Sequence, residues 1–174
     1  MGGAAALIGG VEVSATVTRE NNELVVKVGP IVARIWVVAR SGGKVPLDAD
    51  GRLRLMPGDS QSGVIEGFDA GSPVEVRLYS DPVLLGRSQV GGSGLLSASY
   101  EIPADVTDGD HTVVLVGESP ESEELVVAWS VAIGEPEDGA SWFTIFVLVP
   151  LGLAAASALI LPAVLRRRRQ EQAA

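Results

Sequence analysis

His111 is the only histidine in the chain, so it is the first residue to test for chemistry, because a Ser-His-Asp triad requires one. Asp110 is its neighbour, but adjacent residues of a strand point to opposite faces of a sheet, which places this pair badly for catalysis. No G-x-S-x-G nucleophile elbow, P-loop, dinucleotide fingerprint or zinc motif occurs. We therefore expect no enzymatic activity and no catalytic residue, and we interpret His111 as a strand-edge histidine paired with turn residues.

Paired aspartates offer a second kind of chemistry. Asp48 and Asp50 stand two residues apart in D-A-D-G, which is how an EF-hand calcium loop opens. The fifth position of such a loop would be Arg52, which has the wrong charge, and the twelfth would be Asp59, where a glutamate is needed. A β-turn is the favoured interpretation. An irregular calcium site between loops stays open, with Asp48 and Asp50 as its metal-ligand candidates.

Other acidic clusters are interpreted as solvated turns. One groups Asp105, Asp108 and Asp110, with the same calcium alternative, and another groups Glu118, Glu121, Glu123 and Glu124 at a hairpin tip. A glycosidase would need two such carboxylates at fixed spacing across a cleft, which a hairpin tip does not provide. The chain has no cysteine, which excludes disulfides, thiolate metal sites and cysteine nucleophiles. No cofactor is expected.

The chain of 174 residues is acidic, with a formal net charge of −9 at pH 7. Residues 166–174 carry four arginines and one glutamate, a balance of +3, so residues 1–165 carry −12. A body of this charge repels phosphates and anionic lipid headgroups, and we expect neither a nucleic-acid partner nor docking of the body on a membrane surface. With 47% hydrophobic residues, the chain is expected to fold.

One apolar segment, Trp142 to Leu165, predicts a transmembrane helix. It holds 24 residues without a charge. As a helix it would be about 36 Å long, enough to cross a hydrocarbon core of ~30 Å with some tilt. Trp142 stands where an interfacial aromatic would lie. A buried core helix is the alternative, but such helices are rarely this long and uncharged. The lipid bilayer is therefore an expected partner.

The flanks of this segment predict its orientation. Arg166, Arg167, Arg168 and Arg169 follow it at once, whereas the preceding residues are acidic. Positive residues stay on the cytoplasmic side, so we expect a single-pass protein with its N-terminal domain extracellular and its C-terminus cytoplasmic. The opening MGGAAALIGG lacks the features of a signal peptide. A mis-assigned start or a fragment of a longer protein would explain this. A tail-anchored protein with a cytoplasmic body is the third alternative, which the arginines fit poorly.

Short strand patterns fill the chain before the apolar segment. Residues 11–19 and 23–28 alternate on either side of Asn21-Asn22, as in a hairpin. Residues 31–39 are more continuously apolar, with Trp36 as the expected core anchor. Turn residues recur about every 8–12 residues, and no helical periodicity occurs. We therefore predict an all-β fold, an antiparallel immunoglobulin-like sandwich, plus one C-terminal transmembrane α-helix.

The expected organisation has six consecutive parts, of which only the second is left open, as either a separate subdomain or strands of the main sandwich. They are a flexible lead-in (1–10), a β-hairpin or small β subdomain (11–57), the immunoglobulin-like sandwich (58–134), a linker (135–141), the transmembrane helix (142–165) and a basic cytoplasmic tail (166–174).

Four sequence blocks carry a resemblance to a known family. They read GFDAGSPVEV (67–76), SDPVLLG (80–86), IPAD (102–105) and GDHTVVLVG (109–117). In this order and spacing they resemble the immunoglobulin-like repeats of actinobacterial cell-surface proteins, which often end in a membrane helix and a basic tail. The likeness covers about 90 residues. The chain departs from the family pattern at Asp69 and Ala70, where proline is common, and it has no sortase-type L-P-x-T-G motif before the helix.

The resemblance implies a spacer or adhesive module without catalytic residues. We therefore expect a non-catalytic, membrane-anchored cell-surface protein, whose partners beyond the bilayer are other surface proteins or glycans. The alternative is a calcium- or carbohydrate-binding accessory module of a larger secreted protein.

Overall fold

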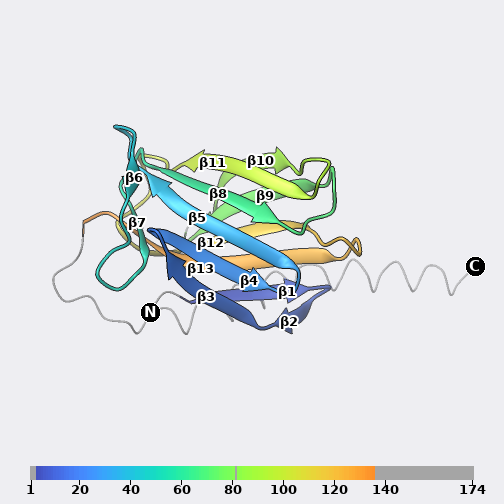
Figure 1. The fold of residues 1–174 in the computed structure, drawn as a ribbon. Coiled ribbons are helices and arrows are strands. Elements are labelled where there is room, and N and C mark those ends of the chain that lie inside the picture. Colours follow the sequence, from blue (N-terminus) through green and yellow to red (C-terminus); the bar gives the residue numbers. More distant parts are fainter. Residues whose placement is uncertain (1–2, 81, 136–174) are drawn as a thin grey trace, which may run out of the picture. The chain divides into compact units, whose positions relative to one another are not determined.

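The computed structural model describes residues 3–80 and 82–135, which form thirteen β-strands in two sheets (Figure 1). Sheet A has the order β10-β9-β12-β13-β1-β2, with the short β7 beside β13, and sheet B has the order β11-β8-β5-β4-β3, with β6 beside β5. All pairings are antiparallel except that of β7 with β13. The prediction of an all-β, two-sheet sandwich is thus confirmed.

The strand bounds follow the alternation seen in the sequence. Sheet A consists of β1 (Ala4–Ile8), β2 (Val11–Val13), β7 (Leu53–Leu55), β9 (Pro73–Tyr79), β10 (Val83–Gln89), β12 (Gly109–Glu118) and β13 (Glu124–Ile133). Sheet B consists of β3 (Ala15–Glu20), β4 (Glu23–Val28), β5 (Ile31–Val38), β6 (Lys44–Val45), β8 (Ser60–Glu66) and β11 (Leu95–Glu101).

The core lies between the sheets and is built by every second residue of each strand. In β5 the inward residues are Ile31, Ala33, Ile35 and Val37, each 1% exposed. Trp36 alternates with them and lies on the outer face, where the ammonium of Lys44 stands 5.5 Å from its ring centroid. The prediction of Trp36 as core anchor was therefore wrong. The tryptophan of the core is Trp129 on β13, 2% exposed.

The structure corrects one expected boundary and resolves the alternative left open for residues 11–57. The flexible lead-in 1–10 was wrong for residues 4–8, which form β1 between β13 and β2, with Ala6 2% exposed. Residues 11–57 are not a separate subdomain, because β5 pairs with β8 and β7 pairs with β13. Residues 1–136 form one compact unit, in which the expected parts 11–57 and 58–134 contribute strands to both sheets.

Both ends of the described chain lie at the same pole of the sandwich, which we call the exit pole. The carbonyl of Gly3, just before β1, accepts a bond of 3.3 Å from the amide of Ser130 on β13, only a few residues before Glu135. The opposite pole, the hairpin pole, carries the turn between β12 and β13 and the other turns that lie beside it, 9–10, 29–30, 67–72 and 90–94. In Figure 1, β1 runs antiparallel beside β13.

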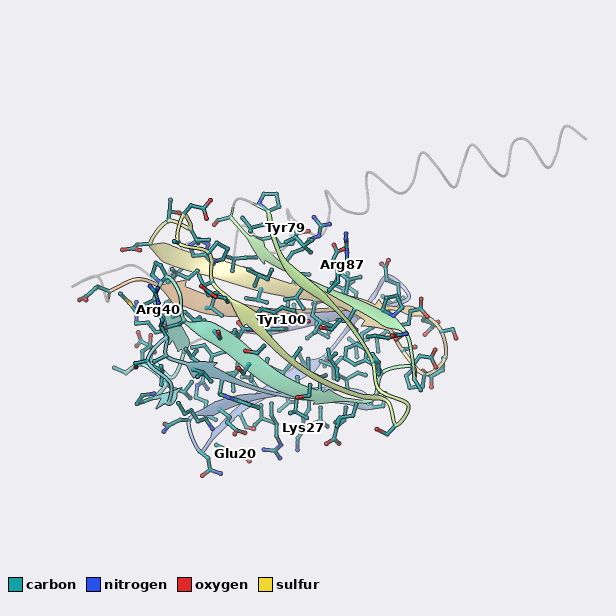
Figure 2. The ribbon with its side chains drawn as sticks, turned by 90° about the horizontal axis from the view of Figure 1, so that it is seen from above. Glu20, Lys27, Arg40, Tyr79, Arg87 and Tyr100 are labelled. Atoms are coloured by element: carbon teal, nitrogen blue, oxygen red, sulfur yellow. The ribbon has the colours of Figure 1, made fainter. Side chains whose placement is uncertain are left out.

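The sandwich is closed along its two long sides by different devices. On one side β2 of sheet A continues through Ser14 into β3 of sheet B, so the chain itself crosses between the layers. On the other side the hydroxyl of Tyr100 on β11, labelled in Figure 2, donates a bond of 2.9 Å to Ser88 Oγ on β10.

The predicted transmembrane helix 142–165 and the basic tail 166–174 lie outside the described residues, as does the linker after Glu135. Across residues 3–80 and 82–135 no helix has the length and apolar character needed to cross a membrane.

Candidate functional site

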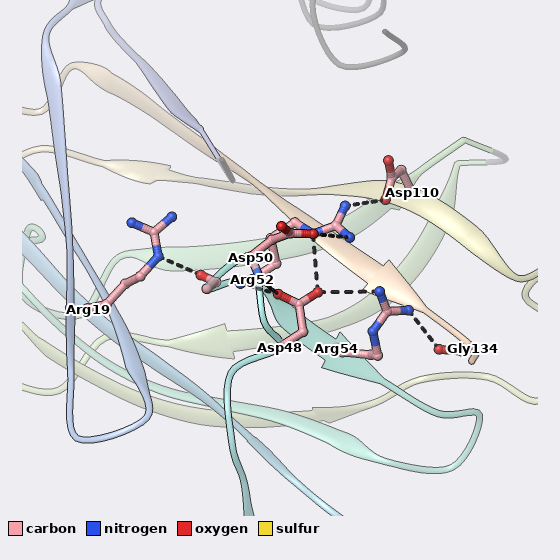
Figure 3. Close-up of polar contacts among 8 residues, drawn as sticks. Arg19, Asp48, Asp50, Arg52, Arg54, Asp110 and Gly134 are labelled. Carbon is pink, nitrogen blue, oxygen red and sulfur yellow. Dashed lines mark hydrogen bonds and ion pairs between the residues drawn. The ribbon is translucent and has the colours of Figure 1, made fainter. Parts of the chain in front are cut away.

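A charge cluster at the exit pole contains both aspartates proposed as calcium ligands (Figure 3). Asp48 Oδ2 lies 3.2 Å from the Nε of Arg52 and 3.3 Å from a terminal nitrogen of Arg54. Arg52 also reaches Asp50 at 3.5 Å and Asp110 on β12 at 2.9 Å. The cluster therefore ties the loop before β7 to the start of β12.

The same aspartate organises the loop backbone. Asp48 Oδ1 accepts bonds from the amides of Asp50, at 3.0 Å, and Arg52, at 2.8 Å. This is the side-chain-to-backbone pattern of an Asx turn, which the D-A-D-G sequence predicts. Arg54 then donates a bond of 3.0 Å to the carbonyl of Gly134, beside the point where the described chain ends.

Two guanidinium groups therefore stand where a cation bound by Asp48 would have to stand. A carboxylate held this way offers few free oxygen lone pairs, whereas calcium takes six to eight oxygen ligands. Among the described residues, no three histidine or acidic side chains come together in a metal-binding arrangement. Nothing in this geometry supports calcium binding by Asp48 and Asp50.

His111 on β12 is 5% exposed and is held through both ring nitrogens. Its Nδ1 lies 2.6 Å from Ser80 Oγ, and its Nε2 lies 2.8 Å from the carbonyl oxygen of Thr107. Asp110 points away from it, toward Arg52, as strand alternation requires. Among residues 3–80 and 82–135 no carboxylate hydrogen-bonds the ring, so these contacts do not form a Ser-His-Asp triad. The histidine ties the end of β9 to the loop before β12.

Glycines of the resemblance blocks are required by packing. Gly67 has φ +95°, and a Cβ there would lie 2.6 Å from the carbonyl oxygen of Pro30. A Cβ on Gly117 would lie 2.8 Å from the ring of Phe68, which is 3% exposed. Only glycine fits where another group approaches the backbone this closely. Both glycines lie at the hairpin pole, where they allow this close packing.

A cluster of three charges lies on the outer face of sheet A. Glu75 accepts bonds from the Nε of Arg77 and, at 2.8 Å, from the Nε of Arg87. These bonds, that from Arg77 first, hold the pKa of the Glu75 carboxyl below its ordinary value of 4.5. No sequence pattern predicts this cluster, because the contact with Arg87 depends on the register of β9 with β10.

The interior offers little room for a ligand. A void of about 20 Å³ lies between the sheets, beside Trp129, whose Nε1 donates a bond of 3.4 Å to Gln61 Oε1. This volume is about that of one water molecule. A shallow, open hollow lies on the outer face of sheet A near the hairpin pole, lined by residues that include Glu75, Arg87, Glu118 and Glu124.

The membrane-anchor residues predicted from the sequence, Trp142, Leu165 and Arg166 to Arg169, lie outside the described residues. No family model matches this chain, and neither does any curated protein. Among solved structures the chain is similar to the crystal structure of the PmoD soluble domain from Methylocystis sp. (Rockwell). The identity is 10% and the TM-score 0.40, over 68% of this chain and 96% of that one. A likeness at this level carries no argument about function.

Proposed function

We propose that this chain is a single-pass cell-surface protein whose sandwich, of immunoglobulin-like type, is a non-catalytic adhesion module outside the cell. The observation that carries the proposal is one junction in the chain. A compact all-β unit ends at Pro136, and 24 uncharged residues followed by four arginines begin six residues later. Such a segment fits a membrane span, and the arginines fit its cytoplasmic end.

The use made of the polar side chains supports a non-catalytic role. Two of the described side chains that the sequence singled out for chemistry, His111 and Asp48, are engaged in holding the fold. His111 bonds Ser80 and Thr107, and Asp48 bonds arginines and its own loop. Catalytic groups, by contrast, lie in a cleft that admits a substrate.

The common pole of the two chain ends favours an adhesion module over an in-line spacer. A spacer lengthens a protein when the chain enters at one pole and leaves at the other. Here the residues before Gly3 and those after Glu135 both continue from the exit pole. A module of this kind makes the protein wider but not longer. The hairpin pole, opposite the two chain ends, is the pole from which no chain continues.

The short linker fixes which pole is presented. The six residues between Glu135 and Trp142 span at most about 24 Å when fully extended. The ten residues of β12 run for about 34 Å from pole to pole. Because the tether is shorter than the body, the exit pole stays near the membrane. The turns of the hairpin pole, with Glu118, Glu121, Glu123 and Glu124, are then the part offered to partners.

The test is extraction of membranes from cells that make the full chain. We expect the protein to stay in the pellet at alkaline pH, where peripheral proteins are released. A matched chain that stops after Glu135 should move to the soluble fraction and keep its β-sheet circular dichroism. Release of the full chain by alkali would overturn the anchor.

A further inference from the structure

The outer faces of the two sheets differ in chemistry. The outer face of sheet B mixes apolar and charged residues. Val32, Trp36 and Val38 of β5 and Val64 of β8 point outward, but Arg34 bridges Glu20 and Glu23 at 3.7 Å each, and the ammonium of Lys44 lies over the ring of Trp36. Its remaining outward positions include Thr16, Thr18, Lys27, Ser62, Ser97 and Ser99. Charged side chains therefore lie among the apolar ones in the middle of this face.

Sheet A differs, because two central rows of its outer face carry no charged side chain on β12, β13 and β1. Over these two rows, strands β1, β12 and β13 are apolar on both faces, and the outward residues of the rows form a surface that we call the A face. It consists of the partly exposed Ala5, Leu7, Val114, Val116 and Val126, together with Ala128, which is 5% exposed. The register places Val116, Val126 and Leu7 in one cross-strand row, and Val114, Ala128 and Ala5 in the next. Apolar residues on both faces of an antiparallel strand indicate that the second face is also covered.

We propose that two copies of this chain associate through the A face, packed sheet to sheet. The side chains suit such packing. Alanine and valine give a low, even surface, and sheets pack face to face at about 10 Å when the residues between them are of this size. The exposed side chains of Leu84 and Tyr79 extend the surface over β10 and β9, at 41% and 38% exposure.

Charges at the two ends of one row select a second copy as the occupant. The row that holds Val116, Val126 and Leu7 continues through Glu75 to Arg87 on one side and to Glu12 on the other. Two copies can be related by a two-fold axis that runs parallel to the strands and lies between β12 and β13. Rotation about this axis places the row of one copy over the same row of the other copy, in the opposite order. Arg87 of each copy then lies over the second copy's Glu12. Figure 2 shows Arg87 on the sheet A side and Lys27 on the opposite side.

The same axis suits copies anchored in one membrane. A rotation about the strand direction keeps both exit poles at the same end, so both chains leave toward the same side. An axis across the strands would put the two exit poles at opposite ends. This agreement rests on the proposed function, whereas the chemistry of the A face does not. Confinement to a membrane also raises the effective concentration of the copies.

Because the chain has no cysteine, single cysteines test the proposal in the full-length protein in its membrane. Val116→Cys and Val126→Cys stand on either side of the axis, and Ser97→Cys on the outer face of sheet B is the matched control. We expect a short bis-maleimide to link most of the Val116→Cys and Val126→Cys protein into dimers and to leave Ser97→Cys monomeric. Equal linking at all three sites, or none at either A-face site, would overturn the proposal.

A charge exchange tests the axis itself. In the Val116→Cys background, Arg87→Glu should abolish most of the linking, because it sets two glutamates against each other, and adding Glu12→Arg should restore it. No loss with Arg87→Glu would contradict this axis. Fractionation separates this result from the anchor. Linked dimers in the soluble fraction would support association through the A face and refute the proposed anchor. Unlinked protein in the membrane fraction would support the anchor and refute association through the A face.

Discussion

The substitution Gly67→Ala tests whether the resemblance blocks serve the fold. Gly67 follows β8 at φ +95°, and an added Cβ would stand 2.6 Å from the carbonyl oxygen of Pro30 and 3.0 Å from Cδ1 of Ile31. The first contact is with backbone, which cannot rotate away. The loop must therefore shift, or the turn between β4 and β5 must move. Both belong to the hairpin pole.

Two costs combine in this variant. An alanine at positive φ loses about 1–2 kcal/mol relative to glycine, and overpacking of a tight contact adds about 1–3 kcal/mol. Gly71→Ala is the matched control, because Gly71 has φ +81° with nothing within 4 Å of the added Cβ. Gly71→Ala should therefore cost about 1–2 kcal/mol and Gly67→Ala about 2–5 kcal/mol.

Urea unfolding of residues 1–136, followed by circular dichroism, measures both variants. The difference between them should be about 1–3 kcal/mol, which for a unit of this size lowers the melting temperature of Gly67→Ala by roughly 3–15 °C relative to Gly71→Ala. Equal losses in the two variants would refute the reasoning, since the contact with Pro30 would then contribute nothing.

Four further substitutions test the polar contacts. Asp48→Asn should lose about 2–3 kcal/mol of unfolding free energy, because it leaves two arginines short of a partner. Asp50→Asn is the control and should lose less than about 0.5 kcal/mol, because the Asp50 side chain is 69% exposed. Added calcium should not change the melting temperature of either variant. Because the pKa of Glu75 is lowered in the folded state, its ionised carboxylate stabilises the fold above pH 4.5, and this stabilisation is lost as the pH falls through the folded-state pKa. The unfolding free energy of Glu75→Gln should therefore fall less than that of the unsubstituted protein when the pH is lowered. Ser80→Ala should cost about 0.5–1.5 kcal/mol in a melting experiment, the value of one hydrogen bond.

The sequence predicted the fold class because alternation is a local signal. Residues 73–79 alternate Val74, Val76 and Leu78 with polar residues, and the structure buries all three of these apolar side chains in β9. Turns at Asn21-Asn22 and at Gly67 were likewise readable, since these residues tolerate positive φ.

Which side of an apolar strand faces the core could not be read in the same way. Ile31 to Val38 is apolar at most positions, so the size of Trp36 suggested burial, but the register of β5 with β4 and β8 turned it outward. Residues 4–8 were too short and too rich in alanine to mark a strand, and only pairing with β13 on one side and β2 on the other makes them one.

Only the local part of the candidate site could be predicted from the sequence. The Asx turn at Asp48 follows from D-A-D-G, but its partners do not. Arg52 and Arg54 lie close in sequence, yet the bond from Arg52 to Asp110 joins residues 58 apart. The positive charge of Arg52 argued against an EF-hand, and in the structure the guanidinium of Arg52 contacts Asp48, Asp50 and Asp110.

The most direct test of the proposed function is the labelling of single cysteines on intact cells stripped of their wall. Ser122→Cys lies in the turn of the hairpin pole, and Gln172→Cys lies in the basic tail. A maleimide that cannot cross membranes should label Ser122→Cys on intact cells and label Gln172→Cys only after lysis. Labelling of Gln172→Cys on intact cells, with Ser122→Cys protected, would contradict the account and put the sandwich in the cytoplasm.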